Sequence, residues 1–366
     1  MRKTAFVILV IAVVLGLGVG VLFLTRPGRE LLGSLYFKLG SKPKIELVMQ
    51  VQVQDAVKNE ADLTIGRLIE ELRKAQIDCT AIERNDPSSV EQLDTIRIDL
   101  KGIPIARSGD LRGLIRGGFP DWTLTRCNQD DCRMSLDVHR LAVLKRDTIE
   151  QTLATIQTRL RDLGVIGRAF RRPGGGSAVY EIVVQLAGRP DDPARVREIL
   201  ITRARLEITP VKDGPFRNRE EALAKYGGTL PLASKLARAV PRPGEAAETW
   251  YLLNRAPVIT GRDLRNARPG RDEFGKWEVD FILTRDGAQR FGRFTEANIG
   301  SRLAIMLDDQ VLSAPSIQSR IEDSGRITGA ANQQEAYDLA LVLRSGSLPA
   351  GIVVLQERSR LTEPHK

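Results

Sequence analysis

The sequence predicts an α+β protein in which an N-terminal transmembrane helix precedes antiparallel sheets with helices packed on one face. Three observations lead to this fold class. Residues 5–24 contain no charged side chain, residues 45–53 alternate between apolar and polar side chains, and residues 149–163 carry apolar side chains at helical spacing. Blocks of helix, strand, hairpin and helix then recur without a strict repeat, as in antiparallel sheets that are covered on one face.

The transmembrane helix is predicted from an uninterrupted apolar run. Residues 5–24 are all Ala, Val, Ile, Leu, Phe or Gly, and Arg26 and Pro27 end the run. A helix of this length reaches about 30 Å, which matches the hydrocarbon core of a bilayer. We therefore expect residues 1–28 to anchor the chain in a lipid bilayer. A cleavable signal peptide is the alternative, but the run exceeds the usual apolar region of about 7–15 residues, and no small-residue cleavage site follows it.

The charges that flank this helix give an ambiguous orientation. Arg2 and Lys3 precede the helix, and five basic residues follow it: Arg26, Arg29, Lys38, Lys42 and Lys44. A count of basic residues on each side therefore does not decide the orientation, although long domains cross membranes largely regardless of their charge. The short basic tail favours an N-terminus in the cytoplasm and the body of the chain on the other side.

The overall composition excludes one class of partner. The formal net charge is +9, but basic and acidic residues are interleaved along the chain, and aromatic residues make up only 5% of it. A surface that stacks nucleic-acid bases needs aromatic side chains set among basic ones. We therefore expect aliphatic cores, a mixed solvated surface and no nucleic-acid partner.

The three cysteines allow two interpretations. In an oxidising compartment, Cys127 and Cys132 would close a short loop through a disulfide. A zinc site is the alternative, with His139 nearby, but it has too few further ligands. Cys79 is expected to be a small buried residue.

The part of the chain before residue 148 predicts a small α+β segment. Alternation predicts a strand over residues 45–53, helical spacing predicts a helix over 62–75, and a second strand follows at 96–100. A Gly-Pro-Asp cluster at 117–121 predicts a turn. These elements form an N-terminal segment over residues 29–148.

The middle of the chain begins with a long predicted helix over residues 147–163, with Asp147 as its N-cap and Gly164 as its stop. Further elements follow as strands over 165–171 and 178–186, a helix over 193–202 that starts after Asp191-Asp192, and a strand over 206–211. Residues 212–255 contain Asp213-Gly214-Pro215, Gly227-Gly228 and Pro241-Arg-Pro-Gly244. They are predicted to be an irregular insertion.

The last part of the chain predicts a strand over 277–283 and a helix over 285–299 capped by Thr284. A hairpin over 303–312 turns at Asp308-Asp309, residue types that accept left-handed backbone geometry. The final elements are a helix over 332–344, which starts with Asn332 and Glu335 in a capping-box pattern and ends at Gly346, and a strand over 352–355.

A search for chemistry gives no catalytic, metal or cofactor site. The sequence has no phosphate-binding loop, dinucleotide fingerprint, zinc-protease motif or nucleophile elbow, and it contains only two histidines. The glycine-rich residues 173–176 lie between two predicted strands and therefore indicate a hairpin turn. Asp308-Asp309 is likewise interpreted as a turn in preference to a metal pair. The sequence thus predicts a non-enzymatic protein.

A series of ordered blocks in the second half carries a family resemblance. The blocks are residues 159–165, 181–188, 203–207, 259–264, 284–288, 295–305, 312–315, 327–329 and 343–349, and residues 51–57 add a further match. In this order they resemble SecD, the accessory subunit of the bacterial preprotein translocase. The positions that carry the resemblance are Gly164, Gly188, Glu207, Thr260, Gly261, Leu264, Gly287, Asn298, Gly300, Asp308, Ala314, Pro315, Gly329, Arg344, Gly346, Leu348 and Pro349.

The chain departs from the SecD pattern in two places. SecD proteins carry an Asp-Leu-x-Gly-Gly motif soon after the first helix, whereas residues 39–46 here contain no Asp and no Gly-Gly pair. A similar Asp99-Leu-Lys-Gly102 stands elsewhere. The family also continues into five more membrane helices, which this chain does not reach before Lys366. We expect either a truncated SecD or a reduced single-span form.

The resemblance implies a split ferredoxin-like base and an inserted α+β head. The base would comprise residues 149–203 and 329–358 with the strand at 45–53, the head residues 204–328, and the tail residues 359–366. It implies a single-pass protein of the bacterial inner membrane with its body in the periplasm, which binds emerging preprotein together with SecF and the SecYEG channel. Residues 212–255 and 260–267 are the first places to look for preprotein contacts. A single-span envelope scaffold derived from SecD, without a role in proton-driven translocation, is the alternative.

Overall fold

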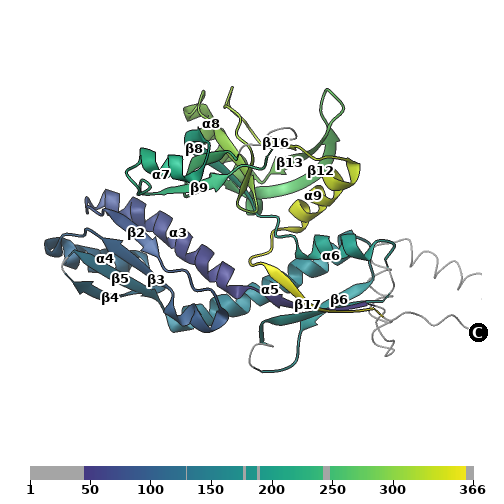
Figure 1. Ribbon diagram of the computed structural model, residues 1–366, viewed down its shortest axis with the longest axis horizontal. Helices are drawn as coiled ribbons and strands as arrows, with labels where there is room; N and C mark the ends of the chain where they lie inside the picture. The colour runs from purple at the N-terminus through teal and green to yellow at the C-terminus, as the bar shows by residue number, and fades with distance from the viewer. Residues whose placement is uncertain (1–44, 129, 176–178, 188–189, 242–247, 360–366) are drawn as a thin grey trace, which may run out of the picture. The chain divides into compact units, whose positions relative to one another are not determined.

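The computed structural model describes residues 45–359 except 129, 176–178, 188–189 and 242–247 (Figure 1). The predicted transmembrane helix and the departing residues 39–44 lie outside the described residues. Within the described part, no helix has both the length and the apolar character needed to cross a membrane. Several antiparallel sheets with accompanying helices confirm the predicted α+β class.

The chain divides into two compact units. The first contains the described residues up to Val51, residues Gln151–Thr202 and the described residues from Ile352 onward. The second contains Gln52–Glu150 and Arg203–Gly351.

The first unit is built on a four-stranded antiparallel sheet in the order β17-β1-β7-β6. Its strands are β1 Ile45–Val51, β6 Gly167–Arg171, β7 Glu181–Leu186 and β17 Ile352–Ser359. Its helices are α5 Val138–Asp162, of which the residues from Gln151 onward belong to this unit, and α6 Pro193–Ile201. Most residues of the two central strands, β1 and β7, are buried, including the consecutive residues 47–49 and 181–184. Asp192 caps α6 by accepting a hydrogen bond from Arg195 N at 2.9 Å.

A buried arginine joins the two helices of the first unit. The Arg159 side chain on α5 is fully buried. It donates hydrogen bonds to the carbonyl oxygens of Ile199 at 2.7 Å and Thr202 at 2.6 Å, at the C-terminal end of α6. A cation at this end of a helix satisfies free carbonyl groups and the helix dipole.

Two predicted helix starts are wrong by nine residues. Helix α5 begins at Val138, and Asp137 caps it by accepting hydrogen bonds from the backbone N of His139 and Arg140. Asp147 therefore lies inside the helix. Helix α3, Val53–Lys74, begins at Val53 and not at residue 62, because small buried residues such as Ala56 and Ala61 carry the apolar face of its first turns.

The first part of the second unit is a four-stranded antiparallel sheet in the order β2-β3-β5-β4. The elements of this part beside α3 are β2 Ala81–Arg84, η1 Val90–Thr95, β3 Arg97–Lys101, η2 Ile105–Arg107, α4 Ser108–Gly118, β4 Trp122–Asn128 and β5 Asp131–Leu136. The predicted strand at 96–100 is β3. The turn predicted at 117–121 connects α4 with β4, two elements that the sequence did not indicate.

The second part of this unit, residues 203–351, holds two more sheets. One has the order β15-β14-β8-β10-β9, with β11 paired to β8, and the other has the order β12-β13-β16. The strands are β8 Leu206–Phe216, β9 Ser234–Arg238, β10 Trp250–Asn254, β11 Ile259–Thr260, β12 Leu264–Arg271, β13 Trp277–Leu283, β14 Leu303–Leu307, β15 Gln310–Ser313 and β16 Ser324–Thr328; the helices are α7 Arg219–Lys225, η4 Gly261–Asp263, α8 Arg285–Ala297 and α9 Gln333–Ser345.

The prediction that residues 212–255 are irregular is wrong. The end of β8, helix α7 and strands β9 and β10 occupy most of this stretch. Gly214-Pro215 lies within β8, and the turn after α7 is formed by the two glycines Gly227 and Gly228. One of them, Gly228, has a φ of +85°, which a residue with a side chain rarely adopts.

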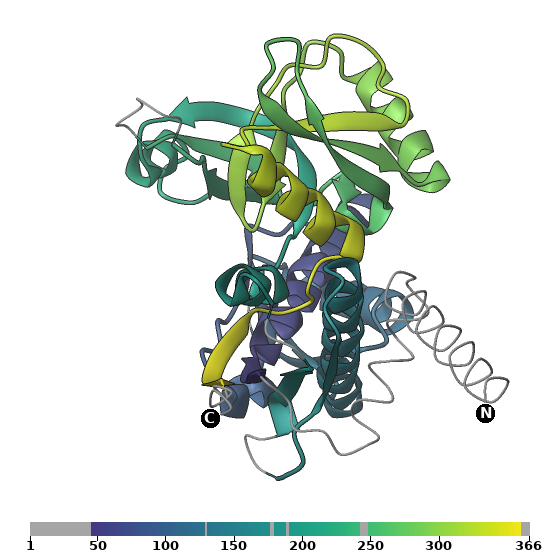
Figure 2. The ribbon, with the colours of Figure 1, turned by 90° about the vertical axis from the view of Figure 1, so that its right-hand side faces the viewer.

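Helix α9 packs with residues 203–328, although residues 329–351 were expected in the base. Ala336, Ala340 and Leu343 of α9 share a buried cluster with Phe281 of β13, and Figure 2 shows α9, in yellow, across the sheet that contains β12 and β13. Of the stretch 329–358, only the residues from Ile352 onward join the first unit.

Candidate functional site

The sheet β15-β14-β8-β10-β9 nearly closes on itself. Its two terminal strands, β9 and β15, meet through a parallel bridge between Ala239 and Val311, and Val240 N donates a hydrogen bond to Val311 O at 2.9 Å. Within the described residues, β9 has β10 as its only full strand partner. We call the boundary between β9 and β15 the seam.

Small and aliphatic side chains fill the interior of this curled sheet. The buried residues of the cluster are Ala237, Leu253, Ala304, Met306 and Val311, and the half-buried Val211, Ala239, Tyr251 and Ala314 pack against it. Val311 therefore takes part both in the interior and in the seam. Any opening of the seam would expose part of this apolar cluster.

Charged side chains next to the seam are paired. Glu207 on β8 accepts from Lys235 on β9 at 2.5 Å, and Arg238 at the end of β9 pairs with Glu248 at 3.1 Å. Lys212 donates to Ser234 Oγ at 2.8 Å, and burial lowers the pKa of Lys212. The contacts of Lys235 and Ser234 tie β9 to β8, whereas the pair of Arg238 with Glu248 ties the end of β9 to the residues before β10.

Asp213, on β8, holds the small helix α7 in place. Its carboxylate accepts from Lys225 Nζ and from the Tyr226 hydroxyl, each at 2.5 Å. These two hydrogen bonds lower the pKa of Asp213 to about 2. The region has a structural ion pair and not a candidate acid or base.

Many of the positions that resemble SecD lie where the chain enters and leaves residues 203–351. The Asp308 carboxylate accepts hydrogen bonds from the backbone N of Ala204 and Arg205, and Leu348 N donates to Arg203 O at 2.9 Å. Gly261 lies near both segments of the chain that enter and leave this region. A Cβ built at Gly261 would be 3.9 Å from Leu206 N and 4.0 Å from Ser347 Oγ.

A second group of these positions organises the start of α8. Asp263 and Thr260 form a capping box on η4, and Asp263 also pairs with Arg290 at 2.5 Å. Gly287 lies so close that a Cβ would be 3.0 Å from Asp263 Cβ and 3.2 Å from Thr284 Oγ1. A side chain at this position would therefore force Asp263 or Thr284 to shift by a few tenths of an ångström.

The remaining positions are turns, caps and core residues. Positive φ values occur at Gly164, Gly300, Gly329 and Gly346, and Asn298 is the C-cap of α8. Ala314 and Leu264 pack against buried clusters. The Arg344 side chain donates a hydrogen bond to Ala267 O. Pro315 O accepts from Leu303 N, Glu207 pairs with Lys235, and Pro349 follows the buried Leu348. Gly188 lies outside the described residues. The described members thus support the backbone and do not converge on a reaction centre.

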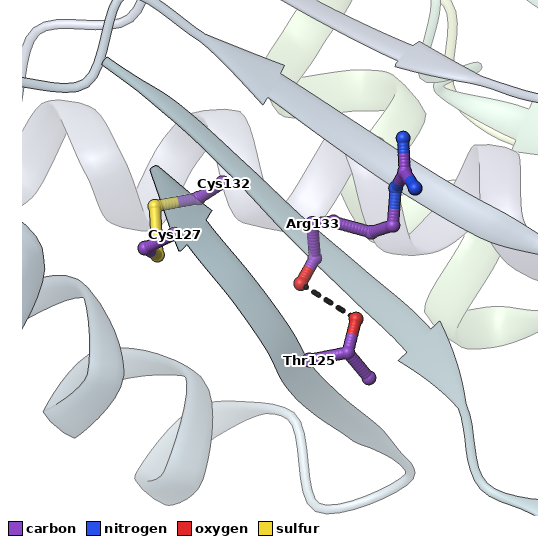
Figure 3. Close-up of a disulfide and its surroundings, with 4 residues drawn as sticks. All are labelled: Thr125, Cys127, Cys132 and Arg133. Carbon is purple, nitrogen blue, oxygen red and sulfur yellow. Dashed lines mark hydrogen bonds between the residues drawn. A yellow bond between two sulfur atoms is a disulfide. The ribbon is translucent and has the colours of Figure 1, made fainter. Parts of the chain in front are cut away.

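Cys127 and Cys132 form a disulfide at the tip of the β4–β5 hairpin (Figure 3). The two residues are register partners with Cα atoms 4.1 Å apart. Next to them, the register shifts between Leu124 and Arg126, and Thr125 Oγ1 donates to Arg133 O at 3.2 Å. Cys79, which was expected to be buried, is only half-buried; it remains a thiol, and its partial burial raises its pKa.

The sequence indicated the disulfide as one of two interpretations, and the structure shows it, whereas the sequence did not indicate the seam. The Cys spacing alone left disulfide and zinc open. The seam depends on a bridge between residues 239 and 311, far apart in the chain. No local pattern encodes such a closure.

Comparison with known proteins connects this chain to one family. Residues 237–350 match the family model of the SecDF P1 head subdomain. The "Protein translocase subunit SecD" of Koribacter versatilis is 35% identical over 332 residues, which cover 90% of this chain and 60% of that protein. The protein of the same name from Aquifex aeolicus is 42% identical over 215 residues, or 59% of this chain and 40% of that one. The chain thus spans well under two thirds of these relatives.

A solved structure of SecDF, described as a membrane component that enhances protein export, is also similar. It is 30% identical and covers 65% of this chain and 98% of its own, with a TM-score of 0.45.

Proposed function

Because this chain is a homologue of SecD over most of its length and carries the SecDF P1 head subdomain, we propose that its head binds emerging, unfolded preprotein and assists its forward movement. SecD is a non-enzymatic subunit of the Sec protein-transport pathway. The chain is therefore a SecD-like accessory protein of that pathway. The proposed partners are the preprotein, SecF, the SecYEG channel and the bilayer.

The observation that carries this proposal is the seam of the head. Strand β9 offers backbone donors and acceptors along one side, next to an apolar interior. An extended segment can add to such an edge through main-chain hydrogen bonds, which depend little on sequence. A protein that handles many different preproteins needs this kind of recognition.

We propose further that the first unit is the base. Along the chain its elements run β1, α5, β6, β7, α6 and β17, and this order with an antiparallel sheet is typical of ferredoxin-like folds. The head would then comprise residues 204–350, because α9 packs within it.

We place the body of the protein in the periplasm of a bacterium, with the N-terminus in the cytoplasm. The disulfide between Cys127 and Cys132 supports this placement, since such bonds persist in oxidising compartments and are rare in the cytosol. The flanking charges of the anchor alone did not decide the orientation.

Site-specific photocrosslinking tests the proposed function. A photoreactive residue at Val240, which is 38% exposed beside the seam, should capture a stalled preprotein in membranes that contain SecF and SecYEG. The matched control carries the same residue at the exposed Thr123 on β4. Equal capture at both positions, or none at Val240 with the partners present, would contradict the proposal.

Co-purification separates the proposal from the scaffold alternative. A translocase accessory should be retained by tagged SecF or SecYEG from detergent-solubilised membranes. A protein that stays in the membrane but is lost from both preparations would favour an envelope scaffold.

A further inference from the structure

The residues that connect the two units adopt a conformation that needs support. Ala204 lies between α6 and β8, is 1% exposed and has a φ of +54°. A residue with a Cβ enters this left-handed region at a cost of about 1–3 kcal/mol and stays there only where its surroundings hold it.

The support comes from the turn of the β14–β15 hairpin. Asp308 Oδ1 accepts from Arg205 N at 2.8 Å and Oδ2 accepts from Ala204 N at 3.3 Å. Asp308 N donates in return to Arg205 O at 3.1 Å. Hydrogen bonds to a carboxylate are stronger than those between neutral groups, so one side chain holds two consecutive backbone amides.

The same hairpin forms one side of the seam. Val311 lies three residues after Asp308, and its carbonyl oxygen accepts the hydrogen bond from Val240 N. The turn itself is tight, with φ values of +50° for Asp308 and +71° for Asp309. A short hairpin of this kind moves as a unit, because its ladder and turn fix the two strands to each other.

We propose that the β14–β15 hairpin couples the seam to the connection at residues 204–205. When the seam opens, the hairpin shifts, the Asp308 carboxylate leaves the two amides, and Ala204 is free to leave its left-handed conformation. The coupling rests on the proposed function in one respect. The proposed function identifies the group that opens the seam as an extended polypeptide.

Hydrogen exchange at the amides of Ala204 and Arg205 in the full chain tests this coupling. Val240→Pro removes the N–H that bonds Val311 O and leaves the hairpin sequence intact, whereas Val240→Ala keeps that N–H. We expect exchange at residues 204–205 to be roughly tenfold faster in V240P than in V240A, the factor that one lost hydrogen bond implies. Equal rates in the two variants would overturn the coupling.

A second pair of variants tests the support itself. Asp308→Asn weakens the acceptor at the two amides, whereas Asp309→Asn removes only an ion pair with the Arg205 side chain. Faster exchange at residues 204–205 in D308N but not in D309N is expected. The inference fails if D308N exchanges like the wild type.

A carboxymethylated, unfolded polypeptide serves as the probe for the seam. Protection of residues 234–238 together with faster exchange at 204–205 supports the coupling. Protection of 234–238 without faster exchange would refute the coupling and leave the proposed function standing. If the probe gives no protection, the proposed binding place is wrong, and the comparison of V240P with V240A still decides the coupling.

Discussion

At the scale of single residues, the disulfide of the β4–β5 hairpin makes a measurable contribution to the stability of the sheet β2-β3-β5-β4. It closes a loop of six residues, from Cys127 to Cys132, beside a register shift that weakens the β4–β5 ladder. Because a cross-link restricts the unfolded chain, removing one of this loop length costs about 2 kcal/mol.

We therefore expect the double variant Cys127→Ser/Cys132→Ser to lose about 2 kcal/mol of unfolding free energy in the second unit. Urea unfolding measures this loss. Cys79→Ser is the control, since Cys79 forms no disulfide. An equal loss in the control would mean that the effect comes from the serines and not from the cross-link.

Asp213 gives a second prediction at this scale, with a defined pH window. Its folded pKa of about 2 lies below its ordinary value of 3.8. A carboxyl group with a lowered folded pKa contributes stability above its unfolded pKa and loses it as the pH falls through the folded pKa. The contribution of Asp213 is thus complete above about pH 4 and disappears toward pH 2.

The wild type should accordingly be more stable than Asp213→Asn at pH 6, and the difference should shrink between pH 4 and pH 2. Thermal unfolding followed by circular dichroism at each pH measures it. Glu220→Gln on the neighbouring helix α7 serves as the control. A difference that does not vary over this range would show that the ion pair with Lys225 does not produce the effect.

At the scale of elements, close packing at the start of α8 depends on one glycine. An alanine at Gly287 would place its Cβ against Asp263 and Thr284, the two residues that organise this helix start. We expect Gly287→Ala to destabilise the head by about 1–3 kcal/mol, the usual cost of overpacking.

Gly292→Ala in the same helix is the matched variant. Its Cβ would meet the flexible end of the Arg320 side chain at 3.4 Å, which can move aside. Alanine also favours a helix over glycine, so this variant should be neutral or slightly stabilising. Chemical denaturation measures the free energy of unfolding of both variants. Equal losses of this free energy would contradict the packing argument.

The elements also show what local sequence can reveal. The hairpin at 303–312 was predictable because Asp308-Asp309 accept left-handed geometry, and both adopt it. The N-caps Thr284, Asn332 and Asp192 were predictable because a short polar side chain precedes each apolar pattern.

The incorrect predictions from the sequence have a physical reason as well. The first turns of α3 bury small residues, which give a weak apolar pattern. In residues 212–255, Gly227-Gly228 forms a turn after α7 but Gly214-Pro215 lies within β8, so residues typical of turns hid the end of a strand. For the site, the sequence indicated the region but not the seam, because long-range strand closure leaves no local mark.

At the scale of the whole molecule, the first unit is assembled from three distant parts of the chain. Strand β1 pairs with β17, so Ile45 faces Ser359 across more than 300 intervening residues. Such a sheet gains its hydrogen bonds only after a large loop is closed. The head and the β2–β5 sheet have more local connections. The two units should therefore differ in stability and unfold in separate transitions.

A pair of core variants tests this division. Met49 in β1 and Phe281 in β13 are 0% and 2% exposed, and truncation of such side chains costs about 2–5 kcal/mol. Met49→Ala should lower the transition of the first unit alone, and Phe281→Ala that of the second alone. Hydrogen exchange resolved by segment during denaturant unfolding assigns each transition. A single transition that both variants shift equally would mean that the two units fold as one.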